Sequence, residues 1–177
     1  MFFIPGFLIS LITFPGVIVH ELAHQLFCRW FKVPVFEVCY FRLENPCGYV
    51  IHEIPSNKMQ SIMISIGPFL VNSIIGFVIA LPAVIPFMMT DNASPIHFLL
   101  IYLGVSIAMH AFPSKGDASA ILAAIKQEDT AIVTKIIAYP IVGFIYLGSL
   151  GSFFWLDLVY GIAVSIWLPM YLIKIFV

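Results

Sequence analysis

The sequence predicts an all-α polytopic membrane protein with about five transmembrane helices and a small cytoplasmic β-hairpin between the first and second spans. Of its 177 residues, 62% are hydrophobic and only 10% are charged, whereas a soluble domain has roughly 25% charged residues. Its apolar stretches follow one another closely, and each is long enough to cross about 30 Å of hydrocarbon. We therefore expect a single membrane-embedded domain over residues 1–177, with the lipid bilayer around it.

Five apolar segments define the predicted spans. They cover residues 2–27, 60–89, 96–113, 131–149 and 152–173. The last two form one apolar run that is too long for a single crossing. Because the residues from Gly148 to Ser152 are small and flexible, we expect a tight turn between two antiparallel spans there.

The basic residues predict the orientation of these spans. In a five-span chain all eight fall on one side of the membrane. They are Arg29, Lys32, Arg42, Lys58, Lys115, Lys126, Lys135 and Lys174. Since basic loops stay in the cytoplasm, we expect an integral protein of the cell membrane with its N terminus outside and its C terminus in the cytoplasm.

The loop between the first two spans has the pattern of a β-hairpin. Residues 33–43 are rich in β-branched and aromatic side chains, residues 44–48 give a strong turn signal, and residues 49–54 resume the strand pattern. An ordinary connecting loop is the alternative.

Composition also excludes some functions. A net charge of -1 does not fit a strongly basic nucleic-acid-binding protein. The three cysteines are odd in number and lack metal-type spacing, so we expect neither a disulfide framework nor a cysteine-based zinc site.

The first span ends with a His-Glu-x-x-His motif at His20, Glu21 and His24. Residues four apart lie on one face of a helix, so both imidazoles can bind one zinc ion while Glu21 acts as the base on a water molecule. An ionisable group inside the bilayer costs roughly 2.5–3.5 kcal/mol and is usually functional. The alternative is an inert, hydrogen-bonded cluster at the membrane interface.

A zinc site needs at least a third protein ligand. Asp117, just after the third span, is the first candidate, because the basic residues place both segments on the same side. His110 is the rival ligand, and a helix cap for a helix that begins at Ala118 is the alternative role of Asp117.

Several elements resemble, in this order, the site-2 protease family of intramembrane zinc metalloproteases. They are the His20 to His24 motif, Gly48-Tyr49-Val50, Gly67-Pro68 with Asn72, and Pro113 with Asp117. The resemblance implies a three-span catalytic core with zinc on His20, His24 and Asp117. It also implies that Glu21 is the catalytic base and that the substrate is a transmembrane segment of another protein.

Two substitutions depart from the family pattern. His110 stands where the family has asparagine and Ala118 where it has glycine, in a motif one residue shorter than usual. We expect His110 and Asn72 to support the zinc ligands or to bind substrate, although Asn72 can equally link helices. The alternative functions are a non-proteolytic zinc-containing membrane scaffold or chaperone and a metal-handling transporter.

Overall fold

The computed structural model describes residues 6–90, 92–126, 130–151 and 154–176. The chain is mostly helical and has one small antiparallel sheet, which confirms the predicted class at that level. The elements are α1 (Gly6–Ile12), α2 (Phe14–Trp30), β1 (Val35–Cys39), β2 (Tyr49–His52), α3 (Lys58–Val84), the π-helix η1 (Ile85–Met89), α4 (Pro95–Met109), α5 (Lys115–Ile125), α6 (Ile132–Gly151), α7 (Leu156–Ile162), the π-helix η3 (Ala163–Trp167) and α8 (Leu168–Phe176).

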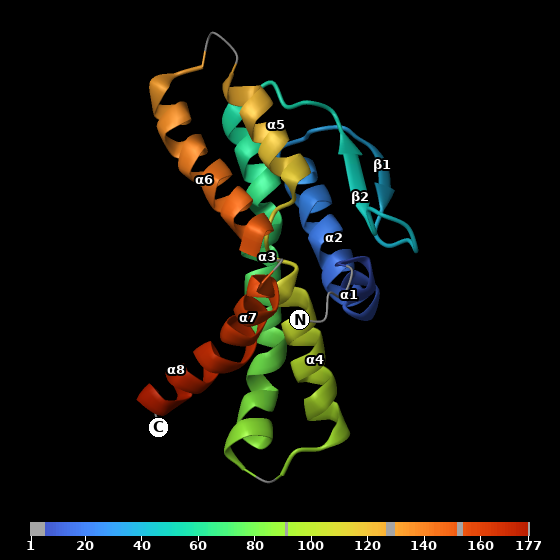
Figure 1. The fold of residues 1–177 in the computed structure, drawn as a ribbon, viewed down its shortest axis with the longest axis vertical. Coiled ribbons are helices and arrows are strands. Elements are labelled where there is room, and N and C mark those ends of the chain that lie inside the picture. The colour runs from blue at the N-terminus through green and yellow to red at the C-terminus, as the bar shows by residue number, and fades with distance from the viewer. Residues whose placement is uncertain (1–5, 91, 127–129, 152–153, 177) are drawn as a thin grey trace.

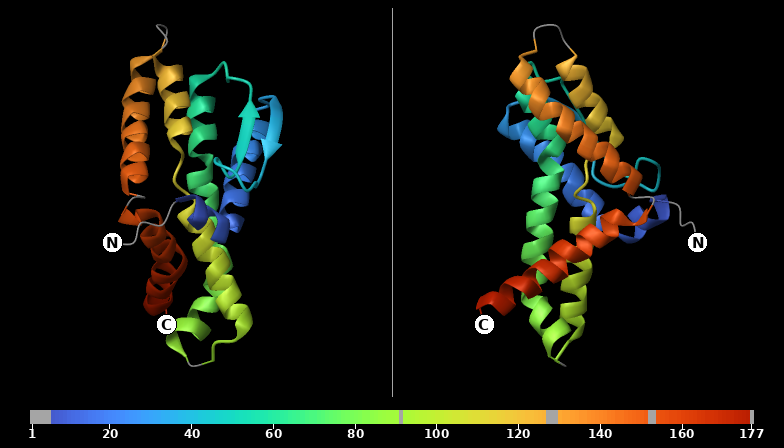
Figure 2. Two further views of the ribbon diagram at one scale, coloured as in Figure 1. Left: turned by 45° about the vertical axis from the view of Figure 1, so that its right-hand side comes forward. Right: turned by 60° about the vertical axis from the view of Figure 1, so that its left-hand side comes forward.

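Helix α3 runs along the long axis and joins two halves of the molecule (Figure 1). The upper half holds α2, the hairpin, α5 and α6, and the lower half holds α4, α7 and α8, as Figure 2 also shows. Glycines let α3 and α4 approach closely, since a Cβ on Gly104 would lie 2.6 Å from the Cβ of Ala80. Small residues at such contacts are typical of helix packing in membranes.

Two helices are long and apolar enough to cross a membrane by length and composition, over Lys58–Met88 and Leu156–Ile175. Pro95–Met109 and Ile132–Gly148 are shorter apolar helices. The described part of the chain therefore supports a membrane location but does not show the five predicted spans.

The first predicted span, residues 2–27, is not one helix. It is divided at Thr13 into α1 and α2, and α2 continues to Trp30. Pro15 explains the break, because its ring would clash with the carbonyl of Leu11 in a continuous helix and it has no N–H to donate there. The third predicted span also ends early, at Met109, and a separate helix α5 follows from Lys115.

The two last predicted spans are not side by side. Helix α6 lies in the upper half, whereas α7 and α8 lie in the lower half (Figures 1 and 2). The tight turn predicted at residues 148–152 is wrong over residues 148–151, which form the last turn of α6, and residue 152 lies outside the described residues. Trp155 follows with a φ of 62°. The C terminus is thus in the opposite half from the start of α3, which differs from the expected grouping of Lys174 with the other basic residues.

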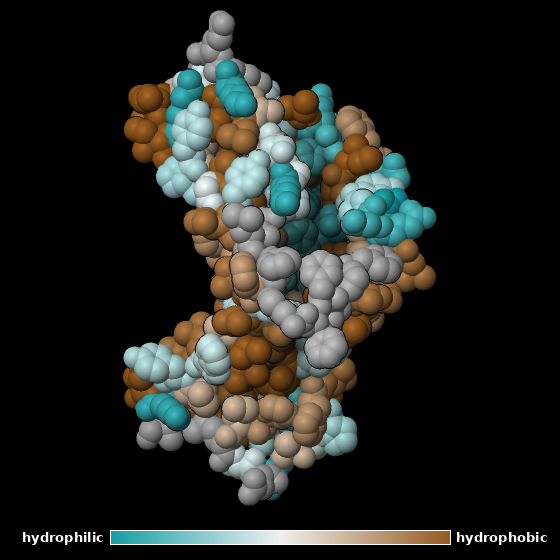
Figure 3. All heavy atoms as spheres, viewed as in Figure 1, coloured by the Kyte–Doolittle hydropathy of each residue, from teal (hydrophilic) through white to brown (hydrophobic). Residues whose placement is uncertain are grey.

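The predicted hairpin is confirmed. Strands β1 and β2 pair antiparallel, with Val38 opposite Val50. The hairpin is attached to α2 by the Tyr40 hydroxyl, which donates to the Gln25 side chain. Within it, the Tyr49 hydroxyl donates to Glu37, which raises the pKa of Tyr49. Hydrophilic residues gather over the hairpin and the upper half, whereas hydrophobic residues dominate the lower half (Figure 3).

Candidate metal centre

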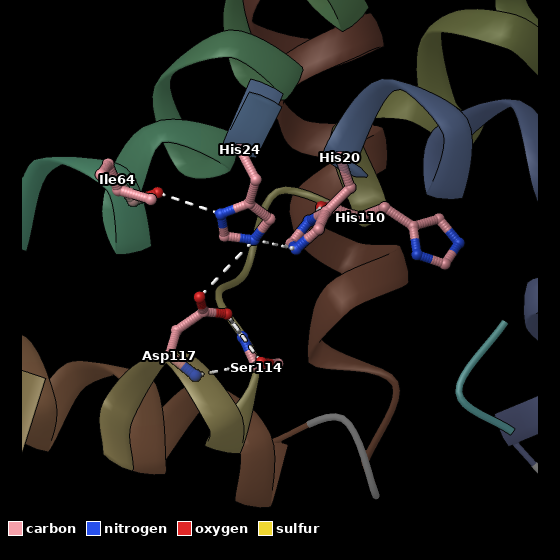
Figure 4. Close-up of polar contacts among 6 residues, drawn as sticks. All are labelled: His20, His24, Ile64, His110, Ser114 and Asp117. Carbon is pink, nitrogen blue, oxygen red and sulfur yellow. Dashed lines mark hydrogen bonds and ion pairs between the residues drawn. The ribbon is translucent and has the colours of Figure 1, made fainter. Parts of the chain in front are cut away.

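Helix α2 presents His20 and His24 on one face, and α5 brings Asp117 to the same point (Figure 4). The Nε2 atoms of the two histidines are 3.2 Å apart. Oδ1 of Asp117 lies 3.5 Å from Nε2 of His24, and the three possible ligand atoms all lie within 4.8 Å of one another. His24 is buried, and His20 and Asp117 are partly buried.

The other ring nitrogens define what this arrangement can bind. Nδ1 of His20 is 2.7 Å from the carbonyl oxygen of His110, and Nδ1 of His24 is 3.0 Å from that of Ile64. A carbonyl only accepts, so each Nδ1 carries the proton, and each neutral imidazole presents a lone pair on Nε2. Two lone pairs and a carboxylate oxygen then face one another, an arrangement that a cation stabilises.

The distances fit a metal ion. Zinc binds imidazole nitrogen at about 2.0–2.1 Å in tetrahedral sites, which places neighbouring ligand atoms about 3.3 Å apart. Histidine ligands also commonly donate the other ring N–H to a backbone carbonyl, as both imidazoles do here. The cluster of His20, His24 and Asp117 could therefore hold a metal ion, and the donor set suits zinc as well as other divalent transition metals.

Asp117 makes two sets of contacts, one with each carboxylate oxygen. Ser114 is the N-cap of α5, so the alternative that Asp117 caps a helix beginning at Ala118 is wrong in detail. Oδ2 of Asp117 accepts from both the amide and the hydroxyl of Ser114, each at 2.7 Å, which forms a capping box. Because this box fixes the carboxylate by one oxygen, the other oxygen is directed at His24.

Glu21 lies on α2 beside the two histidines and is buried against the hairpin. A Cβ on Gly48 would lie 2.7 Å from Cγ of Glu21 and 3.1 Å from the carbonyl oxygens of Cys39 and Tyr40. Only glycine leaves room for the glutamate at this contact. The start of β2 therefore forms one wall of the space that Glu21 occupies.

The two supporting residues lie differently from one another. The His110 ring points away from the cluster (Figure 4), with Nε2 2.7 Å from the Thr13 hydroxyl, and only the His110 backbone carbonyl faces His20. Asn72 is fully buried, and its Nδ2 lies 3.2 Å from the same carbonyl oxygen. Neither side chain belongs to the metal-binding cluster, so the position of the rival ligand His110 does not support direct coordination.

Sequence reasoning missed Ser114 and Ile64. The Ser-x-x-Asp spacing of Ser114 and Asp117 is a capping-box pattern that could have identified the first. Ile64 acts through its backbone, which no side-chain motif reports. The chain matches no protein-family model, no curated protein and no solved structure.

Proposed function

We propose that the protein is an intramembrane zinc endopeptidase of the site-2 protease type. The observation that carries this proposal is the pair of Nε2 atoms held 3.2 Å apart, with both Nδ1 atoms on backbone carbonyls and a carboxylate as third donor. Inert buried histidines would use their polar atoms to satisfy one another's hydrogen bonds. Here the lone pairs converge instead, in a chain whose composition is that of a membrane protein.

Each residue then has a defined task. His20, His24 and Asp117 would hold the zinc ion, which as a Lewis acid polarises the peptide carbonyl and acidifies water. Glu21 takes a proton from the water that attacks the carbonyl carbon. When the C–N bond breaks, Glu21 returns that proton to the departing amine. Glu21 is buried against Gly48, which limits its contact with bulk water.

The substrate must arrive in an extended form, because a transmembrane helix hides its carbonyls in internal hydrogen bonds. The hairpin is suited to this step, since it forms a two-stranded sheet whose outer edges pair with no further strand among the described residues, and such an edge can add an extended segment by β-augmentation. Its contact with Glu21 through Gly48 brings such a strand to the proposed base.

We further propose that the long axis lies across the bilayer, with the upper end in the cytoplasm. Arg29, Lys32, Lys58, Lys126 and Lys135 all belong to segments of the upper half, as expected for a cytoplasmic end. This arrangement keeps the loops before α3 and α6 in the cytoplasm, as expected. It does not keep five spans, because α7 and α8 continue downward from α6 instead of returning beside it.

A scaffold or chaperone that holds zinc without cutting is the second candidate, and the His110 ring favours it. The asparagine that the family has at this position is a possible transition-state stabiliser, whereas the His110 side chain is turned toward Thr13. A protein that binds membrane segments without hydrolysing them would not need that group.

The two functions are separated by Glu21→Gln, which preserves side-chain size. We expect the variant to keep its zinc and its fold but to lose about 10²–10⁴-fold in turnover, since an amide cannot accept the proton. Wild type and variant should be compared for zinc content and for cleavage of a panel of helix-destabilised membrane peptides. Equal cleavage by both proteins would remove Glu21 from the mechanism. Zinc-loaded wild type that binds but never cleaves the peptides would favour the scaffold.

A further inference from the structure

Both imidazoles of the cluster depend on backbone carbonyls that a regular helix would not offer. In an α-helix each carbonyl accepts from the amide four residues later, which leaves little freedom to bind a side chain. The carbonyl of Ile64 lies inside α3, and that of His110 lies directly after α4. Each therefore needs a specific reason to be available to a histidine.

For Ile64 the reason is a proline four residues later. The residue that would donate to the Ile64 carbonyl is Pro68, which has no N–H and whose ring pushes that carbonyl out of line. The freed oxygen lies 3.0 Å from Nδ1 of His24. Prolines are tolerated in membrane helices where another group satisfies the freed carbonyl, and His24 is such a group here.

For His110 the reason is the end of α4. Carbonyls at a helix C terminus have no intrahelical partner, and the His110 oxygen accepts from His20 Nδ1 at 2.7 Å. Asn72 holds the same oxygen, with Nδ2 at 3.2 Å, and also contacts the carbonyl oxygens of Ile107 at 3.1 Å and Gly16 at 3.2 Å. This amide thus fixes the end of α4 relative to α2.

The orientation of the Asn72 amide supports this role. The side chain is fully buried, and its Oδ1 has no hydrogen-bond partner in the described structure. Leaving a buried acceptor unpaired is costly, so the contacts of the amide nitrogen with three carbonyls must offset that cost. An amide that served only to fill space would have no reason to choose this arrangement.

We propose that one segment of α3, residues 64–72, positions both histidines of the metal centre. Pro68 does so for His24 by freeing a carbonyl, and Asn72 does so for His20 by holding one. Both are positioning residues, because neither side chain touches the ligand atoms. The inference rests on the proposed metal-binding role of the two histidines.

Pro68→Ala gives the sharpest test, because it restores the amide that the helix lacks at this position. The new amide would draw the Ile64 carbonyl back into the helix and weaken its bond to His24. We expect a loss of about 10–100-fold in Zn²⁺ affinity, the usual effect of removing a partner of a histidine ligand, in a variant that remains folded without metal.

Pro82→Ala is the control, since it makes the same backbone change in the same helix but returns the carbonyl of Val78, an exposed residue, to the helix. Asn72→Ala should lower Zn²⁺ affinity to a similar extent. Its control is Ser73→Ala, because Ser73 bonds Tyr160 and the carbonyl of Phe69 instead of the centre. If Asn72→Ala does not fold, the proline pair still decides the matter for His24.

The measurement is competition for Zn²⁺ against a chromophoric chelator, using full-length protein in detergent, with the visible spectrum of Co²⁺-loaded protein as a second readout. A wild-type protein that binds no Zn²⁺ would overturn the metal centre itself. A wild type that binds Zn²⁺, with Pro68→Ala equal to Pro82→Ala and Asn72→Ala equal to Ser73→Ala, would leave the centre intact and overturn the positioning role.

Discussion

The upper and lower halves of the molecule are both mostly helical, but they bury different groups. The lower half packs α3 against α4 and α8 through an apolar core. Its buried residues are Ala80, Ala83, Val84 and Ile101. The upper half buries a carboxylate, an imidazole and an amide at Glu21, His24 and Gln25.

The difference follows from where the helices end. Around the candidate metal centre, α2 begins, α4 ends and α3 contains Pro68. These interruptions leave backbone carbonyls without helical partners, and the side chains of His20, His24 and Asn72 bond to them. Where α3 and α4 run side by side in the lower half, glycine and alanine let the backbones approach. The candidate metal centre therefore lies where helices begin, end or contain a proline, whereas the close packing of α3 against α4 lies farther along α3.

The largest effect in the upper half is expected at Asp117. Asp117→Ala removes a proposed ligand, so Zn²⁺ affinity should fall by more than the roughly 100-fold limit typical of residues behind the ligands. His110→Ala should leave most of the zinc bound, because His20 bonds to the backbone of His110 and not to its ring. Zinc content after dialysis against a weak chelator measures both.

A control separates the ligand role of Asp117 from its capping role. Ser114→Ala breaks the capping box and should cost about 1 kcal/mol of stability while leaving the carboxylate available. If Ser114→Ala loses as much zinc as Asp117→Ala, the carboxylate matters only as a cap. If His110→Ala loses the zinc instead, the third ligand is His110.

Gly48→Ala should reduce turnover by about 10²-fold, because the added methyl group would displace Glu21, and a shift of about 1 Å near reacting groups has an effect of this size. Zinc binding should persist, since the histidines are not touched. Gly143→Ala is the control, because a Cβ there meets nothing within 4 Å. Cleavage assays at saturating Zn²⁺ compare the two variants, and equal activity would contradict the proposed contact.

A substitution in the lower half should affect stability alone. Gly104→Val would place a side chain against Ala80 and the carbonyl of Gly76, and overpacking of this kind costs about 1–3 kcal/mol. Thermal unfolding in detergent should register the loss, whereas Zn²⁺ affinity of the folded protein should match wild type. A loss of affinity as large as that of Asp117→Ala would show that the two halves are not separable.

Site-directed cysteine labelling tests on which side of the membrane each end of the molecule lies, and we expect these substitutions to have no effect on function. In a background without Cys28, Cys39 and Cys47, single cysteines would replace Lys126, Asn92 and Lys174. The proposed arrangement predicts that the first reacts from the cytoplasm and the other two from the opposite side, because both lie toward the lower end. Labelling of Lys174 together with Lys126 would restore the five-span topology.

The sequence was enough to predict the membrane character, the hairpin and the pairing of His20 with His24. Each depends on neighbours along the chain: long apolar runs, alternating β-formers around a turn, and a spacing of four in a helix. The sequence also identified Asp117 as a candidate ligand, although it could not exclude His110. Both residues follow the same apolar segment, and only the direction of their side chains distinguishes them.

The tertiary structure decided the rest. Hydropathy is the same whether an apolar run reverses or continues, so composition could not tell that α6 and α7 follow one another along the long axis. Nor could a side-chain motif reveal that Ile64 and His110 act through their carbonyls, because every residue has one. Which carbonyl is free depends on where a helix ends or meets a proline, and which side chain reaches it depends on how the helices pack.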